Sequence, residues 1–167
     1  FTPLLLAAMA FEGSGTNFIA DDILATEGTA FLDIFLIIGF ILNIILIERI
    51  GRMKLQIIGF TGMAVGLGIL IIGSLYNSTM IGLLFVGFAI YNLLMNMGPN
   101  ATTFVLPAEL YPTEMRATAH GFAAGIAKLG AALGIILVPI LKEGWGIPVT
   151  LGVMFGLVIL ALIITFL

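Results

Sequence analysis

The sequence predicts an all-α integral membrane protein, and two observations lead to this fold class. First, 61% of the 167 residues are hydrophobic, 9% are charged and the mean hydropathy is +1.26, which leaves too little polar surface to cover a water-soluble globule. Second, the apolar residues fall into segments long enough to cross a bilayer core of about 30 Å, which takes roughly 20 residues of helix. The chain has room for about six such helices and reads as one domain over residues 1–167.

Each apolar segment is expected to be a helix, because an open strand in lipid would leave backbone amides and carbonyls without partners. Glycines four residues apart recur inside these segments, a spacing that lets membrane helices approach closely. The pairs are Gly62 and Gly66, Gly121 and Gly125, and Gly130 and Gly134. The predicted helices cover residues 1–19, 29–47, 55–75, 80–106, 117–141 and 147–167. The lipid bilayer is therefore the first expected partner.

The distribution of charge predicts how these helices are oriented. Four of the six lysine and arginine residues lie in the second and fourth connections, which the positive-inside tendency assigns to the cytoplasm. An even number of spans then places both chain ends there, in a multi-pass protein of the plasma membrane. The apolar run 1–11 lacks the charged region and cleavage pattern of a signal peptide, so we expect the chain to begin within a helix. The four basic residues are Arg49, Arg52, Lys54 and Arg116.

Several function classes find no support in the composition. Cysteine is absent and His120 is the one histidine, so neither a metal site nor a cofactor is expected. No nucleophile stands beside a base, and no glycine-rich loop has the phosphate-cradling pattern, which argues against an enzyme. The net charge of −3 gives no sign of nucleic acid binding.

Lys128 is the most costly residue of the predicted membrane interior, since it lies near the middle of segment 117–141. A lysine at the centre of a span costs on the order of 3 kcal/mol. Helical spacing places Gly121, Gly125 and Ala131 on its face, so the ammonium group projects from small residues that can border a cavity. We predict that it contacts a substrate or ion. The alternatives are snorkelling to the interface and pairing with a carboxylate.

Segment 80–106 carries a stripe of polar side chains. Asn92, Asn96 and Asn100 recur every four residues and Thr103 follows, so all four share one helix face, which should meet protein or water rather than lipid. Gly98-Pro99 interrupts the helix beside Asn100, and transporters use such breaks where helices line a cavity. We predict that the four residues bind substrate. Hydrogen bonding between helices is the alternative for Asn92 and Asn96.

Two carboxylates lie within the predicted spans, Glu12 and Asp33. Either could carry a proton across the membrane if desolvation favours its protonated form. Asp33 is close to the outer end of its predicted helix and has the alternative role of an interfacial charge. Glu12 is therefore the preferred candidate for proton coupling.

Two connections carry distinctive motifs, Glu48-Arg49-Ile50-Gly51-Arg52 and Pro107-Ala108-Glu109-Leu110-Tyr111-Pro112-Thr113-Glu114-Met115-Arg116. Both resemble signature loops of the major facilitator superfamily, in its sugar-porter and phosphate:proton symporter branches. The first matches the family's Asp-Arg-x-Gly-Arg loop with Glu48 in place of the aspartate. The second matches the Pro-x-Glu-x-x-Pro-Thr-x-x-Arg loop in full, so the resemblance rests on two motifs in the right order.

The resemblance extends over essentially the whole chain and implies the C-terminal half of a twelve-helix carrier. The six helices would form an inverted pair of three-helix repeats, and an N-terminal six-helix half would be the partner. The charged loops would act as a cytoplasmic gate with a closed and an open state; the alternative is that these charges set topology alone. The gate residues are Glu48, Arg49, Arg52, Glu109 and Arg116.

Within the superfamily, Met97 to Phe104, the second loop and Lys128 are most similar to the phosphate:proton symporters. In that branch the residues at the positions of Asn100 and Lys128 contact phosphate. A lysine with amide donors suits an oxyanion in a dry cavity. The chain departs from that branch in its first helix, where the expected tryptophan and aspartate are absent and Glu12 is the nearby carboxylate. Organic anions therefore stand beside phosphate as candidates.

Three functions follow from these observations. The first is secondary active transport by alternating access, as proton-coupled symport of a small anion such as phosphate or an organic acid. The second keeps the fold but moves a neutral sugar or metabolite, with Lys128 paired internally. The third is a non-transporting membrane subunit that serves as a scaffold in a larger complex.

Overall fold

The structure, a computed structural model, describes residues 18–75 and 81–166, and these residues form helices and short connections without a strand. Five helical stretches are long and apolar enough to cross a membrane: Thr26–Ile50, Arg52–Leu75, Gly82–Leu110, Arg116–Trp145 and Ile147–Phe166. The all-helical membrane class is therefore confirmed for the described residues. The predicted first span lies almost wholly outside them, so the count of six and the inverted repeat stay predictions. The helices are α2 (Phe18–Ile50), α3 (Arg52–Leu75), α4 (Ile81–Met97), α5 (Pro99–Leu110), α6 (Arg116–Trp145) and α7 (Ile147–Phe166).

Helix α2 is longer than the sequence predicted, because the expected connection 20–28 is helical. This stretch contains no proline, and a single glycine such as Gly28 costs a helix only about 1 kcal/mol. At a rise of about 1.5 Å per residue, the 33 residues of α2 extend over roughly 50 Å, more than the hydrocarbon core. One end of α2 therefore continues beyond the membrane interior.

The predicted span 80–106 is two helices. Helix α4 ends at Met97, Gly98 has φ −116° and ψ −99°, and α5 begins at Pro99. Proline fits the first position of a helix because its missing N–H would have no partner there. The helix break expected at Gly98-Pro99 is confirmed. By contrast, Pro107 and the residues up to Leu110 were expected in a loop and lie inside α5, so the connection to α6 is shorter than predicted.

Two other connections are shorter than predicted and consist of a single glycine with positive φ. Gly51 (φ 91°) joins α2 to α3, and Gly146 (φ 83°) joins α6 to α7. The Gly146 N–H caps α6 by donating to the Lys142 carbonyl at 3.0 Å. Glycine adopts this left-handed backbone without the steric cost that other residues incur. The glycine of the first charged loop is thus the turn itself.

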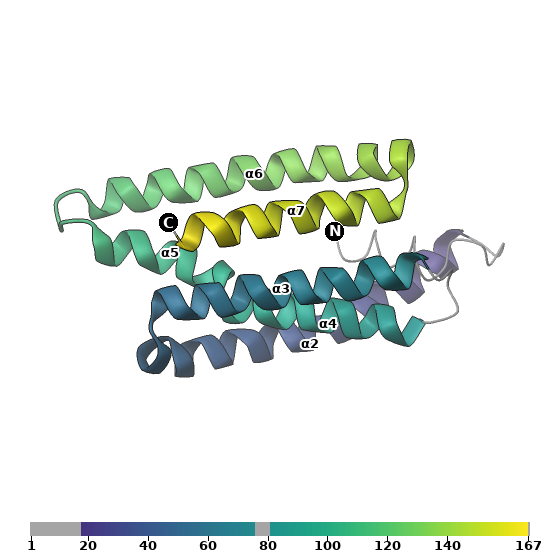
Figure 1. The fold of residues 1–167 in the computed structure, drawn as a ribbon, viewed down its shortest axis with the longest axis horizontal. Coiled ribbons are helices and arrows are strands. Elements are labelled where there is room, and N and C mark those ends of the chain that lie inside the picture. The colour runs from purple at the N-terminus through teal and green to yellow at the C-terminus, as the bar shows by residue number, and fades with distance from the viewer. Residues whose placement is uncertain (1–17, 76–80, 167) are drawn as a thin grey trace.

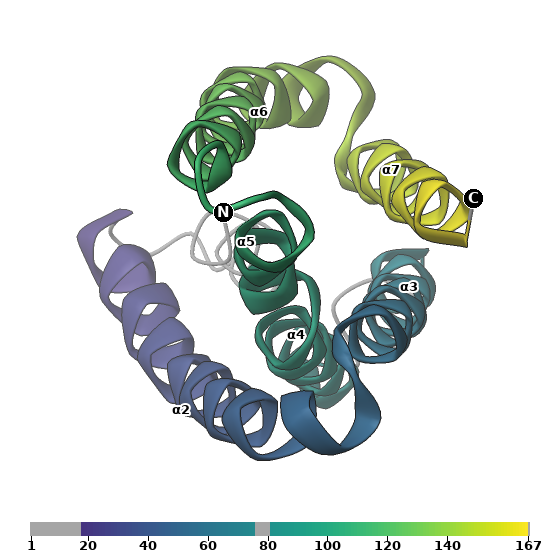
Figure 2. The ribbon, with the colours of Figure 1, turned by 90° about the vertical axis from the view of Figure 1, so that its left-hand side faces the viewer.

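Helix α4 lies between α2 and α3, and α7 packs on the other side of α3 (Figure 2). The core around α3 and α4 includes Leu67, Leu70 and Phe88, with Leu32 from α2 and Leu151 from α7. Without a hydrophobic drive between helices in lipid, close backbone approach and side-chain packing hold such a bundle together.

The predicted glycine contacts hold on α3 but not on α6. Gly62 and Gly66 are buried against α4, and a Cβ added at Gly66 would lie 3.0 Å from the Gly87 carbonyl oxygen. Gly121 and Gly125 of α6 have nothing within 4 Å among the described residues. The surface of α6 is instead largely exposed and apolar, as a surface that meets lipid or another set of helices should be. Its exposed side chains include Phe122, Ile126, Leu129 and Leu133.

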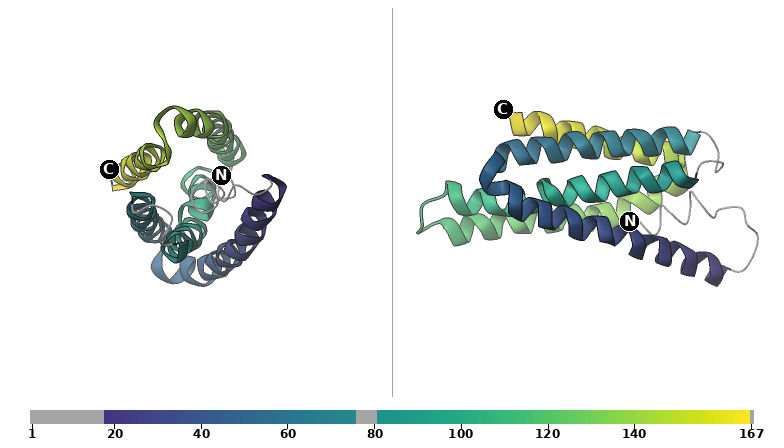
Figure 3. Two further views of the ribbon diagram at one scale, coloured as in Figure 1. Left: turned by 90° about the vertical axis from the view of Figure 1, so that its right-hand side faces the viewer. Right: turned by 90° about the horizontal axis from the view of Figure 1, so that it is seen from below.

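The two charged connections lie at one end of the bundle. The α2–α3 turn and the α5–α6 loop are together at this end, and the α6–α7 turn is at the opposite end (Figures 1 and 3). The end of α7 lies beside the start of α3, where Gln56 Nε2 donates to Thr165 Oγ1 at 3.4 Å. The predicted grouping of the basic residues on one side therefore agrees with the arrangement of the helices.

Candidate substrate site between α5 and α6

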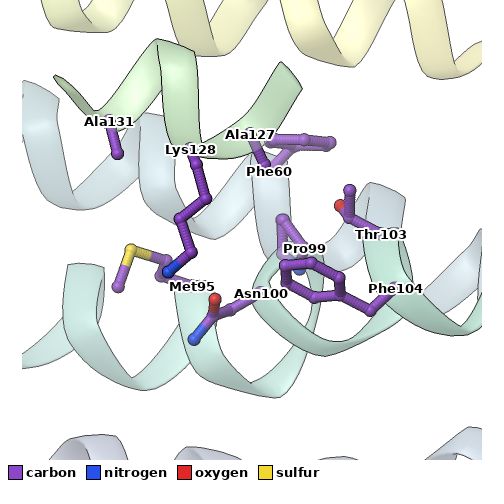
Figure 4. A pocket seen from close by; sticks show the side chains of 9 residues that line it. All are labelled: Phe60, Met95, Pro99, Asn100, Thr103, Phe104, Ala127, Lys128 and Ala131. Carbon is purple, nitrogen blue, oxygen red and sulfur yellow. The ribbon is translucent and has the colours of Figure 1, made fainter. Parts of the chain in front are cut away.

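A pocket of about 390 Å³ opens between α5 and α6, at the helix break. Helices α3 and α4 complete its wall (Figure 4). Its lining combines a cationic group, an amide and a hydroxyl with aromatic and small apolar side chains, the mixture expected of a small-molecule site. The lining residues are Phe60, Met95, Pro99, Asn100, Thr103, Phe104, Ala127, Lys128 and Ala131.

Lys128 extends from α6 into this pocket toward Asn100 of α5 (Figure 4). Both residues are exposed, since the pocket is open on one side. Ala127 and Ala131 flank the lysine, so no bulky neighbour on α6 covers the ammonium group. The predicted surface of small residues around Lys128 is confirmed at Ala131.

The amide stripe divides into one residue that lines the pocket and two that do not. Asn100 and Thr103 line it, whereas Asn92 and Asn96 are buried with 5% and 0% exposure. Asn96 Nδ2 donates to the Asn92 carbonyl at 2.8 Å, and Asn100 Nδ2 donates to Asn96 Oδ1 at 2.7 Å. Asn96 therefore does not line the pocket, but it is hydrogen-bonded to Asn100, which does. The chain of hydrogen bonds ends at the backbone carbonyl of Asn92, which accepts from Asn96.

The position of α5 depends on close packing at the break. A Cβ on Gly98 would lie 2.7 Å from the Leu55 carbonyl oxygen and 2.8 Å from Gly59 Cα. The Met97 carbonyl at the end of α4 accepts a hydrogen bond from Asn43 Nδ2 of α2. The Gly98 carbonyl accepts from the Thr102 N–H at 3.1 Å and also from Thr102 Oγ1 at 3.0 Å. The pocket floor is thus fixed against both α2 and α3.

Sequence reasoning missed Asn43 and the apolar part of the wall. The available signal for Asn43 was an amide in the middle of an apolar span. Nothing in the sequence connects Phe60 of α3 or Met95 of α4 with Lys128, since that neighbourhood depends on how the helices pack. His120 Nδ1 lies 3.2 Å from the carbonyl oxygen of Phe104, so the start of α6 contacts the helix that lines the pocket.

The predicted gate residues lie together at one end of the bundle. Arg52, the first residue of α3, forms an ion pair with Glu109 near the end of α5, with 2.7 Å between the guanidinium nitrogen and Oε1. Glu48 and Arg49 are exposed in the last turn of α2, and Arg116 begins α6. Within the described ranges these three make no ion pair. Of the predicted charge network, the structure therefore contains one ion pair, between Arg52 and Glu109.

Of the two candidate proton carriers, Asp33 lies among the described residues. Asp33 is exposed on α2 and does not line the pocket. Glu12 lies outside the described residues. The structure thus brings Lys128, Asn100 and Thr103 together and leaves Asp33 elsewhere.

A bundle of membrane-crossing helices with a broken helix and a polar pocket at the break is the architecture of secondary transporters. Residues 16–167 match the family model described as "Sugar (and other) transporter". The chain therefore belongs to the sugar (and other) transporter family, and the resemblance to the major facilitator superfamily is confirmed. This is a family of transporters rather than enzymes.

Curated relatives at the level of single proteins are named as phosphate transporters. The chain is 44% identical over 102 residues to "Low affinity inorganic phosphate transporter 4" of Lotus japonicus, covering 58% of this chain and 18% of the relative. It is 40% identical over 102 residues to the protein of the same name from Medicago truncatula, with the same coverage. It is 36% identical over 132 residues, 77% of this chain and 25% of the relative, to "Probable inorganic phosphate transporter 1-6" of Arabidopsis thaliana. The chain thus spans about a fifth of the length of these relatives.

Proposed function

We propose that this chain forms the C-terminal six-helix half of a secondary transporter that moves a small oxyanion together with protons. The observation that carries the proposal is the position of Lys128, in one pocket with Asn100 and Thr103. A cation deep in a span is tolerated when it faces a polar passage. That passage is the pocket between α5 and α6.

The chemistry of the pocket favours an anion over a neutral solute. An oxyanion accepts charge-assisted hydrogen bonds from an ammonium group, and such bonds are roughly twice as strong as those between neutral groups. A neutral sugar needs hydroxyl and amide partners but no cation. Inorganic phosphate is the first candidate, since the relatives compared above carry phosphate transporters' names, and small organic acids are the second.

Transport by alternating access requires two states and a second wall. The Arg52–Glu109 pair serves as part of the gate at the end with the basic connections, which we assign to the cytoplasm. The second wall is the N-terminal six-helix half, which covers the exposed apolar face of α6. Glu12 is the preferred proton carrier, and the assembly resides in the plasma membrane.

The decisive experiment measures uptake of radiolabelled phosphate by the full-length carrier in proteoliposomes with an imposed proton gradient. Lys128→Gln is expected to abolish uptake, because the variant keeps a polar side chain but loses the charge. Lys142→Gln in the same helix is the matched control and is expected to retain uptake, since Lys142 does not line the pocket. Normal uptake by a correctly folded Lys128→Gln carrier would remove Lys128 from the binding site.

Competition distinguishes the two remaining functions. Excess glucose that blocks uptake where phosphate and organic acids do not would favour a neutral solute. A protein that catalyses no solute movement when complete, and that copurifies with a larger assembly, would be a scaffold subunit instead.

A further inference from the structure

The hydrogen bonds behind the pocket determine which way the Asn100 amide faces. An amide side chain presents a donor nitrogen on one side and an acceptor oxygen on the other, and its orientation follows from its partners. Asn96 is fully buried and faces the backbone carbonyl of Asn92 at 2.8 Å. A carbonyl only accepts hydrogen bonds, so the atom of Asn96 at this position is the nitrogen. Asn96 Oδ1 must then face the opposite way.

The same reasoning fixes the next residue. Asn96 Oδ1 only accepts, so the Asn100 atom 2.7 Å from it is Nδ2. Asn100 Oδ1 is thereby turned away from Asn96 and toward the pocket, on the side from which Lys128 enters (Figure 4). The backbone carbonyl of Asn92 thus determines, through two hydrogen bonds, that Asn100 presents its oxygen rather than its nitrogen to the pocket. The pocket presents a cation from α6 and an acceptor oxygen from α5.

We propose that Asn96 is a positioning residue that holds Asn100 as an acceptor, and that the pocket consequently selects oxyanions that carry a proton. The unprotonated oxygens of such an anion meet the ammonium group of Lys128, and its O–H donates to Asn100 Oδ1. Monobasic phosphate and arsenate have both kinds of oxygen. Sulfate has the same tetrahedral shape but no proton, so its oxygen would face the Asn100 oxygen without a hydrogen bond. This inference rests on the proposed function, since it concerns the anion bound at that site.

The first test compares anions on the unaltered full-length carrier. Competition against labelled phosphate is measured at mildly acidic pH with arsenate, sulfate and perchlorate. Perchlorate is tetrahedral and singly charged but has no proton, so it separates charge from protonation. Arsenate is expected to compete about as well as phosphate, and sulfate and perchlorate at least about tenfold more weakly. Equal competition by perchlorate or sulfate would overturn the inference.

The second test changes the positioning residue. Asn96→Leu removes the acceptor and frees the Asn100 amide to turn, so the preference for phosphate over sulfate is expected to fall about tenfold. Asn96→Asp, protonated in its buried site, keeps both a donor toward Asn92 and an acceptor toward Asn100 and is expected to restore the preference. Thr150→Val on α7 is the control, because it removes a buried hydrogen-bonded side chain that lies outside the pocket and the helix break.

The outcomes separate this inference from the proposed function. If Lys128→Gln abolishes phosphate uptake but Asn96→Leu keeps the phosphate preference, the positioning role is wrong and the anion site stands. An equal loss of preference in Thr150→Val and Asn96→Leu would indicate general destabilisation and also contradict the role of Asn96. If Lys128→Gln transports normally, the anion site itself is wrong. Should Asn96→Leu fail to fold, the anion comparison on the unaltered carrier decides.

Discussion

Arg52 and Glu109 are 57 residues apart in the chain, yet their side chains form an ion pair at 2.7 Å that joins the start of α3 to the end of α5. The side chains keep 35% and 43% of their accessible surface, so solvent screens the pair and its contribution to stability is small, about 0.2–1 kcal/mol. An interaction this weak can break in each cycle of the transport proposed above. It is suited to a gate rather than to a permanent clamp.

Reversing these charges tests the gate. Arg52→Glu and Glu109→Arg each place like charges together and are expected to slow phosphate uptake several-fold while lowering the melting temperature of the purified carrier only slightly. The double variant Arg52→Glu/Glu109→Arg restores the pair with opposite polarity and is expected to recover part of the uptake. The measurement is initial uptake rate in proteoliposomes. Additive losses in the double variant would show that the two residues act independently.

The contact between Gly59 and Gly98 is expected to be sensitive to a single methyl group. A Cβ on Gly59 would lie 2.9 Å from Gly98 Cα and closer still to the Pro99 ring, so Gly59→Ala should force α3 away from the helix break. Overpacking of this kind costs about 1–3 kcal/mol, and the thermal unfolding temperature in detergent should fall. Gly68→Ala in the same helix, where nothing lies within 4 Å of the new Cβ, is the control and should keep or slightly raise this temperature, because alanine favours a helix more than glycine does. A similar loss in both variants would contradict the packing argument.

The turn at Gly51 should tolerate asparagine better than alanine. Its φ of 91° lies in the left-handed region, where a residue with a Cβ pays about 1–2 kcal/mol. Since nothing lies within 4 Å of an added Cβ, the cost is purely one of backbone conformation. Thermal unfolding of Gly51→Ala and Gly51→Asn would measure it, with the asparagine variant expected to lose less stability. An unaltered melting temperature in Gly51→Ala would show that the turn adopts another conformation.

Glu12 and Asp33, the two carboxylates predicted to lie in the membrane, are expected to differ in proton coupling. Glu12→Gln should abolish uptake driven by a pH gradient but retain exchange of internal for external phosphate, because exchange needs no net proton movement. Asp33→Asn should retain both activities, since Asp33 does not line the pocket. Parallel measurements of gradient-driven uptake and exchange distinguish these results. Loss of coupling in Asp33→Asn instead would move the proton path to α2.

The sequence predicted the parts of the fold that depend on local chemistry. Apolar length located α3 and α7 closely, and Gly98-Pro99 correctly predicted the helix break. The charged connections were placed too broadly, because single glycines at Gly51 and Gly146 suffice to reverse the chain and neighbouring polar residues stay helical. Composition marks where a helix leaves the membrane but not where its hydrogen bonds end.

The candidate site was predictable in part for a similar reason. Lys128 and Asn100 were singled out individually, and the pocket brings them together. Which amides of the stripe would face the pocket was not predictable: residues four apart drift around a helix by about 40° per step, and the break at Gly98 redirects the chain between Asn96 and Asn100. The apolar wall from Phe60 and Met95 depends on packing between distant segments.

The single-residue turn at Gly51 also limits how the described helices can move. Because one residue joins them, α2 and α3 are unable to slide independently at that end. A displacement of one helix there therefore moves the other. Arg52 is the very next residue. Breaking the ion pair between Arg52 and Glu109 would therefore allow α2 and α3 to tilt together. A weak surface interaction would in this way control the position of two helices.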